Sequence, residues 1–257
     1  MAANPSGGRR SRRARSASSR PNSFYLILGA IALVGVGGLA YVALKPEAAI
    51  APPAELPADL AELGPPQPYV KGDPNAPVQI HEFADFECPS CARFAVITEP
   101  DVRTRIVDAG RANLSYYDLP LPQHLHSYPA SHAAACADEQ NRFWEMHDKI
   151  YEAQDSWSTG RTNNPKSIFR DMARTIGLNL SQWEECYDSK KYQRRIDANH
   201  AEAIRQGINS TPSFIVNGRV LRGAISFDEL NKVVTEAAAA AQSGDTAAAA
   251  QSGDTAR

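Results

Sequence analysis

The run from Phe24 to Leu44 contains 21 residues and no charged side chain. A helix needs about 20 apolar residues to cross a bilayer, so this run restricts the possible folds more than any other feature. Residues 1–45 hold seven of the 27 basic residues and none of the 29 acids. Because basic residues mark the cytoplasmic side of a membrane helix, we expect a single-pass anchor with its N-terminus inside.

The alternatives to an anchor are a cleaved signal peptide and a buried helix of a soluble core. The apolar region of a signal peptide is usually about 7–15 residues, shorter than this run. The small-residue sequence Ala49-Ile50-Ala51 is followed by Pro52, an unfavourable residue after a cleavage site. The sequence therefore favours an uncleaved signal-anchor in the cytoplasmic (inner) membrane, with the catalytic domain in the periplasm or another extracytoplasmic space.

The chain divides by composition into five segments. Seven prolines lie between Pro46 and Pro68, which is typical of a semi-rigid extended spacer. The nonamer AAAAQSGDT occurs twice near the C-terminus, too few copies for a repeat fold. The expected segments are a basic cytoplasmic tail (1–23), the transmembrane anchor (24–44), a Pro/Ala-rich linker (45–69), a globular domain (70–240) and a low-complexity tail (241–257).

The globular segment reads as an α/β unit interrupted by helices. Strand patterns occur at 78–83 and 112–119, and apolar residues at helical spacing follow the first of them. Asn217-Gly218 lies between two further apolar runs and predicts a hairpin. The residues from about 122 to 206 are helical in pattern. One helix there is expected to start at the capping box Ser181–Glu184.

Two cysteines, Cys88 and Cys91, stand where the first strand should meet a helix. Backbone N–H groups at a helix start favour a thiolate, and Pro89 fits the first helical turn. Outside the cytosol such a pair can be redox-active or structural, and a metal site is the third alternative. A four-residue loop gains little from closure, which argues against a purely structural bridge. We expect a redox couple in which Cys88 attacks and Cys91 resolves the mixed disulfide.

Three segments, in order, carry a resemblance to a known family. Gly72–Cys91, Glu139–Asp148 and Gly207–Gly218 resemble the DsbA-type thiol–disulfide oxidoreductases of the thioredoxin superfamily, in their membrane-anchored form. The resemblance implies a thioredoxin fold with an inserted helical domain at about 122–206.

The resemblance also implies roles for individual residues. Cys88 becomes the nucleophile and Cys91 the resolving thiol, with Glu82 as a buried acid that handles the proton of Cys91. Glu82 could also be an ordinary strand carboxylate. Thr211 and Pro212 match the loop in which a cis proline packs against the active site. By base rate only about 5–6% of X-Pro bonds are cis.

The other two cysteines, Cys136 and Cys186, lie in the helical block. The resemblance implies that they form a structural disulfide, and two unpaired buried thiols or a second redox pair are the alternatives. If joined, they would close a long loop, which stabilises a fold by roughly 4 kcal/mol in the chain-entropy model.

One departure from the family concerns the residue before the second cysteine. Strongly oxidising members have histidine there, and this chain has Ser90. Asp85 and Glu87 would raise the thiol pKa if they lay near it, so a milder oxidant is expected and the direction of electron flow stays open. No histidine has a clear place as a thiol-activating base, and His124 is expected in solvent.

The expected function is the introduction of disulfides into exported proteins. The partners would be thiol-containing exported proteins, a membrane redox partner that is DsbB-like or vitamin K epoxide reductase-like, and the lipid bilayer through Phe24–Leu44. No dissociable cofactor, metal or nucleic acid is expected. The alternatives are a membrane-tethered reductase or isomerase, and a thioredoxin-fold scaffold of a membrane complex.

Overall fold

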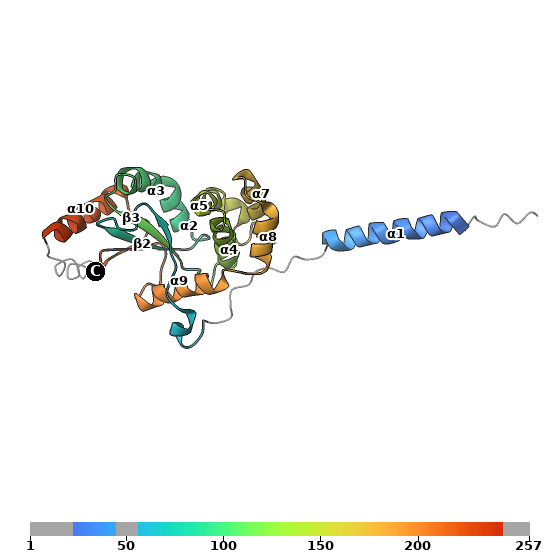
Figure 1. Ribbon diagram of the computed structural model, residues 1–257, viewed down its shortest axis with the longest axis horizontal. Helices are drawn as coiled ribbons and strands as arrows, with labels where there is room; N and C mark the ends of the chain where they lie inside the picture. Colours follow the sequence, from blue (N-terminus) through green and yellow to red (C-terminus); the bar gives the residue numbers. More distant parts are fainter. Residues whose placement is uncertain (1–22, 45–55, 244–257) are drawn as a thin grey trace, which may run out of the picture. The chain divides into compact units, whose positions relative to one another are not determined.

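The computed structural model describes residues 23–44 and 56–243 (Figure 1). Nearly all of the expected basic tail, residues 45–55 of the expected linker and residues 244–257 of the expected low-complexity tail lie outside the described residues. The chain separates into two compact units, residues 1–48 and 49–257.

The first unit contributes the helix α1, Ser23–Leu44, which coincides with the uncharged run. Its described side chains, residues 25–38, are exposed, and they include Tyr25, Leu33 and Val34. Within the described parts of the chain, no helix is both long enough and apolar enough to span a membrane.

The second unit contains a five-stranded sheet with the strand order β1-β3-β2-β4-β5. The central pair, β2 and β3, is parallel, and every other neighbouring pair is antiparallel. The strands are β1 (Tyr69–Lys71), β2 (Gln79–Ala84), β3 (Asn113–Asp118), β4 (Ser213–Val216) and β5 (Arg219–Arg222). All of the expected strands are present. The three-residue β1 was not predicted, because it lies at the end of the proline-rich stretch and is too short to show alternation.

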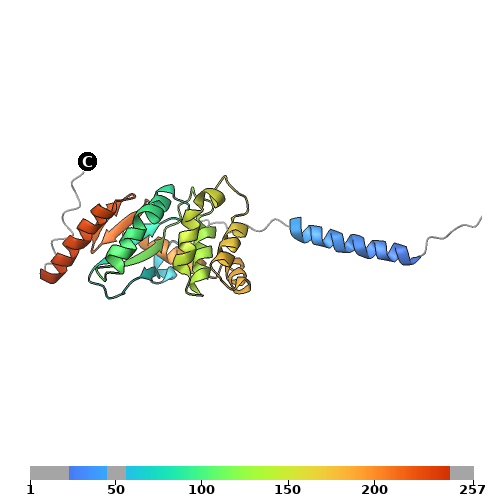
Figure 2. The same cartoon turned by 90° about the horizontal axis from the view of Figure 1, so that it is seen from above.

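Helices cover both faces of this sheet. The segment that begins with α2 (Pro89–Arg93) and α3 (Glu99–Val102) connects β2 to β3, and α10 (Phe227–Ser243) packs beside α3 (Figure 2). The helix α9 (Gln193–Arg205) packs on β3 from the opposite side (Figure 1). A mixed sheet between helical layers with this strand order is a thioredoxin-type α/β fold.

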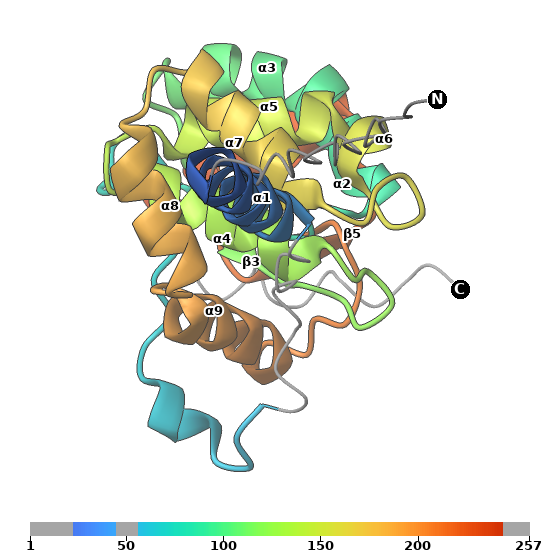
Figure 3. The same cartoon turned by 90° about the vertical axis from the view of Figure 1, so that its right-hand side faces the viewer.

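The inserted block lies between β3 and β4 in the sequence, and its helices pack against one another (Figure 3). It contains α4 (Ser127–Asp138), α5 (Phe143–Glu152), α6 (Gln154–Trp157), α7 (Pro165–Thr175) and α8 (Leu180–Asp188), followed by α9. The helix α8 begins at Leu180, one residue before the expected capping box, because the side chain of Asn179 accepts a hydrogen bond from Gln182 N and caps the helix. Trp157 and Trp183 are fully buried in this block.

The segment between β2 and β3 contains two widened, π-helical turns, at Phe94–Thr98 and Arg103–Val107. Pro100 has no N–H to donate, so a regular helical bond is lost there and the preceding turn opens. The N–H of Glu99 consequently bonds to the carbonyl of Phe94, five residues back. The side chain of Glu99 is completely buried.

Residues at the end of the expected linker belong to the fold. Asn199 of α9 accepts a hydrogen bond from Gln67 N at 2.8 Å, and Arg195 donates to Gln67 O at 2.8 Å. The guanidinium of Arg195 also stacks over the ring of Tyr69, 3.7 Å from its centroid. The domain therefore includes residues just before position 70, where its start was expected.

Candidate active site

The two cysteines of the Cys88–Cys91 motif lie at the junction of β2 and α2. Cys88 is the N-cap of α2 with extended backbone angles (φ −73°, ψ 121°), and Pro89 occupies the first helical position. The side chain of Cys88 is 8% exposed, whereas Cys91, one turn into the helix, is completely buried. Both thiols are free. The structure therefore represents the dithiol state, with Cys88 as the accessible sulfur.

The environment of Cys88 favours its thiolate. A hydrogen bond from the Cys91 thiol is the largest cause, and it lowers the pKa of Cys88 to about 5 against the opposing effect of burial. Thr211 and the backbone N–H groups of Ser90 and Cys91 lower it further. These N–H groups belong to the first turn of the helix and have no partner within it. Cys88 is therefore largely ionised at neutral pH.

The loop before β4 closes the site on the side of Cys88. The peptide bond between Thr211 and Pro212 is cis. Cys88 Sγ lies 3.5 Å from the backbone oxygen of Thr211, to which the thiol donates. Thr211 Oγ1 is buried and has no hydrogen-bond partner within the described residues. Its hydroxyl is thus available to donate to the sulfur once Cys88 is ionised.

Replacing Thr211 with valine is expected to raise the pKa of Cys88 above about 5, because the hydroxyl donor to the thiolate is lost. In the parent protein, alkylation of Cys88 by iodoacetamide should be constant near neutral pH and fall as the pH drops through about 5. The thiolate absorbance should titrate over the same range. In Thr211→Val both curves should move to higher pH.

Thr211→Ser is the matched control for this prediction, because it keeps the hydroxyl and removes only a methyl group. Its titration should follow that of the parent. Identical curves for the valine and serine variants would show that the hydroxyl does not act on Cys88.

Cys91 lies next to a buried carboxyl group on β2. Burial raises the pKa of Cys91 well above the ordinary thiol value, and its hydrogen bond to Cys88 and the charge of the Cys88 thiolate add to the effect. Glu82 is itself completely buried, and neither carboxyl oxygen has a hydrogen-bond partner in the described part of the chain. Burial, and then the charge of Glu99, raise the pKa of Glu82 well above the ordinary carboxyl value. Both shifts favour the protonated, neutral forms of Glu82 and Cys91.

Asp85 and Glu87 do not act on Cys88 as expected. Asp85 accepts hydrogen bonds from Glu87 N and Leu121 N, each at 2.8 Å, and from the Ser127 hydroxyl. Glu87 accepts from His126 N at 2.7 Å and from Thr159 N. Both carboxylates therefore bind backbone groups of the insertion. The rise of the thiol pKa that was expected if they lay near the thiol does not occur, since the pKa of Cys88 is lowered.

His124 is also not in free solvent. Its Nδ1 lies 2.8 Å from Asp85 Oδ2, and its side chain is 19% exposed. The hydrogen bond with Asp85 raises the pKa of His124, and the charges of Glu87 and Cys88 contribute. His124 therefore lies near the active site on a loop, where its raised pKa favours the protonated form, although Ser90 occupies the usual histidine position.

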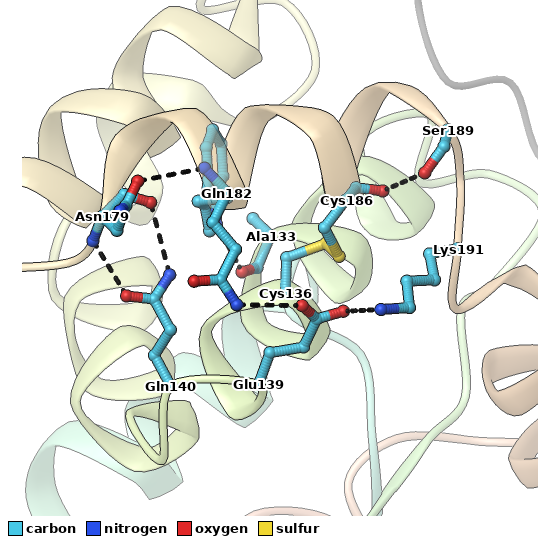
Figure 4. Close-up of a disulfide and its surroundings, with 10 residues drawn as sticks. Ala133, Cys136, Glu139, Gln140, Asn179, Gln182, Cys186, Ser189 and Lys191 are labelled. Atoms are coloured by element: carbon cyan, nitrogen blue, oxygen red, sulfur yellow. Dashed lines mark hydrogen bonds and ion pairs between the residues drawn. A yellow bond between two sulfur atoms is a disulfide. The ribbon is translucent and has the colours of Figure 1, made fainter.

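The second pair of cysteines is joined. A disulfide connects Cys136 of α4 to Cys186 of α8, across a sequence separation of 50 residues (Figure 4). Trp183 Nε1 donates to Ala133 O at 3.0 Å between the same two helices. Glu139 pairs with Lys191 beside the bridge at 2.6 Å. This bridge lies in the inserted block and takes no part in the Cys88 site.

No group of three or more metal-ligating side chains occurs in the residues that the structure describes. The candidate site therefore consists of Cys88 and Cys91, with Glu82 behind them and the Thr211–Pro212 loop in front. Sequence reasoning named these residues. It missed Glu99 and Arg103, which contact each other behind the site, and it misplaced His124.

Comparison with known proteins identifies a protein family that this chain matches. The family profile described as "Thioredoxin" matches residues 65–236. The chain is 33% identical over 184 residues to the Na(+)/H(+) antiporter NhaA 3 of Salinispora tropica, covering 71% of this chain and 26% of that protein. It thus spans about a quarter of the antiporter relatives that it matches. It is 25% identical to disulfide bond formation protein D of Bacillus subtilis, covering 65% of this chain and 78% of that protein.

Solved structures give the same fold. Wolbachia pipientis alpha-DsbA1 superposes with a TM-score of 0.62 at 20% identity, covering 72% of this chain and 98% of that one. A thioredoxin-like oxidoreductase from Silicibacter pomeroyi superposes with a TM-score of 0.55 at 26% identity, covering 68% of this chain and 94% of that one.

Proposed function

Since the chain belongs to the thioredoxin family, we propose that it is an extracytoplasmic thiol–disulfide oxidoreductase that introduces disulfides into exported proteins. The observation that carries this proposal is the opposite behaviour of its two thiols. The pKa of Cys88 is lowered to about 5 while the pKa of the buried Cys91 is raised. Disulfide exchange requires one sulfur that a client thiolate can attack and that is a good leaving group, which is Cys88. It also requires a second, shielded thiol that resolves the mixed disulfide, which is Cys91.

The reaction proceeds through a mixed disulfide. A client thiolate attacks Cys88 in the Cys88–Cys91 disulfide, and Cys91 leaves and takes up a proton. A second client thiolate then attacks the client sulfur and releases Cys88 as a thiolate. Two electrons and one disulfide bond have been exchanged, so the client is oxidised and the protein holds a dithiol. A membrane redox partner, DsbB-like or vitamin K epoxide reductase-like, would reoxidise it.

The low pKa of Cys88 supports an oxidant over a reductase. A stabilised thiolate lowers the free energy of the dithiol state relative to the disulfide state, which raises the reduction potential. The site also weighs against a scaffold, because a scaffold needs neither an ionised Cys88 nor a neutral acid such as Glu82 beside Cys91.

The reduction potential of the Cys88–Cys91 couple tests this proposal. Residues 56–243 would be equilibrated with glutathione buffers and the thiols trapped by alkylation. The expected value lies nearer to about −120 mV, the value of DsbA, than to about −270 mV, the value of thioredoxin. A value near that of thioredoxin would replace the proposal with a tethered reductase.

We place the domain outside the cytoplasmic membrane, held by residues 24–44. The uncharged run and the arginines before it support this, and so does the Cys136–Cys186 disulfide, since such bridges persist in oxidising compartments. The full chain is expected to stay in the membrane pellet after alkaline carbonate extraction. A chain that starts at residue 56 should be soluble. Release of the full chain by carbonate would remove the anchor from the proposal.

A further inference from the structure

A cluster of ionisable side chains lies behind Cys91, and only one of its members, Glu82, belongs to the candidate site for thiol–disulfide exchange. Arg103 contacts both of its acidic neighbours, Glu99 at 2.6 Å and Asp148 at 2.8 Å. His147 Nδ1 lies 2.9 Å from Asp148 Oδ1, and its Nε2 lies 3.8 Å from Glu99 Oε2. The charge of Glu99 also acts on Glu82. We call Glu82, Glu99, Arg103, His147 and Asp148 the acid cluster.

Several atoms of the acid cluster are buried without a partner. Among the described residues, both carboxyl oxygens of Glu82, Glu99 Oε2 and His147 Nε2 make no hydrogen bond. Glu82, Glu99 and His147 are completely buried. Buried polar atoms normally find partners, and leaving them unsatisfied costs about 1–3 kcal/mol each. An arrangement that leaves four such atoms in one place calls for a functional reason.

The acid cluster reaches solvent at its far end. Asp148 is 41% exposed, and with Arg103 it lines a pocket of about 380 Å³. Lys71, Val96, Thr104 and Tyr151 also line this pocket, whereas Cys88, Thr211 and Pro212 do not. The opening is therefore separate from the place where a client would meet Cys88.

We propose that Glu99 and His147 carry the proton of Cys91 between Glu82 and the pocket at Asp148. This inference rests on the proposed exchange at Cys88 and Cys91. It gives the proton its own route, so that a client bound over Cys88 does not block it.

The proton balance follows from the exchange steps. When Cys91 leaves as a thiolate, the Glu82 carboxyl protonates it and is reprotonated through Glu99. His147 gives up a proton at Nε2 and regains one at Nδ1 from the side of Asp148 and the pocket. During reoxidation the path runs in reverse. Glu82 first passes its proton to Glu99, and the carboxylate so formed takes the proton of Cys91. The Cys91 thiolate then attacks Cys88 in the mixed disulfide and releases the partner thiolate.

The titratable and charged groups around this path come from every element packed on it. They are Cys91 from α2, Glu99 from α3, Arg103 from the following turn, Tyr116 from β3, and His147, Asp148 and Tyr151 from α5. The two tyrosines bond to each other through their hydroxyls at 3.2 Å. Burial raises the pKa of both tyrosines, so they remain neutral. Arg103 neutralises acid charge and fixes the orientation of Glu99.

The reduced protein reacting with Ellman's reagent separates the proton step from the attack by Cys88. In the first phase the Cys88 thiolate takes up one thionitrobenzoate and releases another. In the second phase Cys91 loses its proton, attacks Cys88 and releases the second thionitrobenzoate. The absorbance of the released dye gives both rates, and repetition in deuterium oxide gives the isotope effect of each phase.

Glu99→Gln and His147→Gln are expected to slow the second phase by about tenfold or more, since a positioned acid–base group contributes about 10²- to 10⁴-fold. The isotope effect on this phase should increase and its pH profile should change. The first phase should be unchanged. Glu152→Gln is the matched control, because Glu152 lines the same pocket, bonds only to Lys149 among the contacts found, and should leave both phases unchanged.

The outcomes distinguish the inference from the function on which it rests. A second phase that keeps its rate and isotope effect in the variants would overturn the proton route, even if their unfolding midpoints fell. Loss of the first phase in the parent protein would instead remove the proposed function. If Glu99→Gln fails to fold, His147→Gln and Asp148→Asn decide, since Asp148 lies at the surface.

Discussion

Replacing Cys88 with alanine is expected to reduce client oxidation to the rate measured without protein. Cys88 is the less buried cysteine of the pair and has the lowered pKa, whereas Cys91 is completely buried with a raised pKa, so Cys88 is the group at the site that attacks or is attacked. The assay is the recovery of activity by a reduced, unfolded client with two essential disulfides. Residual catalysis in Cys88→Ala would show that the chemistry lies elsewhere.

Cys91→Ala gives the complementary result. Without the resolving thiol, Cys88 should form mixed disulfides with clients that accumulate and appear as larger species on non-reducing gels. The pKa of Cys88 should rise in this variant, because the hydrogen bond from Cys91 is the largest cause of its low value. The mixed disulfides of Cys91→Ala should therefore form at a higher pH than the parent protein needs to oxidise its clients. Absence of trapped species at any pH would contradict the assigned order of attack.

Removing the disulfide by the double change Cys136→Ala and Cys186→Ala is expected to lower the free energy of unfolding by about 4 kcal/mol. The bridge closes a loop across 50 residues, and closure of such a loop restricts the unfolded chain by this amount in the chain-entropy model. For a domain of this size the thermal midpoint should fall by roughly 10 °C. Denaturant unfolding followed by tryptophan fluorescence measures the change.

A reductant provides the matched comparison. In a background with Cys88→Ala and Cys91→Ala, the Cys136–Cys186 bridge is the only disulfide that the chain can form. Reduction should then bring the midpoint to that of the protein lacking all four cysteines. Equal midpoints with and without reductant would mean that the bridge contributes nothing to stability.

The sequence was sufficient to predict the parts of the site that follow from local order. Cys88 and Cys91 stand where a strand pattern gives way to a helix pattern, and in the structure Cys88 caps α2 and Cys91 lies within it, shortly after β2. Glu82 is six residues before Cys88 and lies on β2, where alternation places its side chain on one face of the sheet. The parallel pairing of β2 with β3 then brings Tyr116 opposite Glu82.

The acid cluster was not predictable in the same way. Glu99 stands among polar residues near a proline and reads as a surface residue at a helix kink. Its burial depends on the widened turn before Pro100, which shifts the residues that face the sheet. Its contact with His147 depends on the packing of α5, which follows α3 after 40 residues of intervening chain and cannot be predicted from periodicity.

The error over Asp85 and Glu87 has a similar origin. Proximity in sequence to Cys88 suggested a repulsive effect on its thiolate, because a carboxylate nearby disfavours a second negative charge. The direction of each side chain is set instead by donors from segments beyond residue 120. Backbone N–H groups of Leu121, His126 and Thr159 supply them. Such long-range partners leave no local signal.

These same bonds bear on how separable the inserted block is. Besides the carboxylate contacts, Gln154 Nε2 donates to the backbone oxygens of Phe86 at 2.7 Å and Cys88 at 3.1 Å. If residues 122–206 were excised, the carboxylates of Asp85 and Glu87 and the backbone oxygens of Phe86 and Cys88 would lose these hydrogen-bond donors. The block is therefore not a detachable module. A graft of this active site onto a smaller thioredoxin scaffold would have to bring α4 and α6 with it.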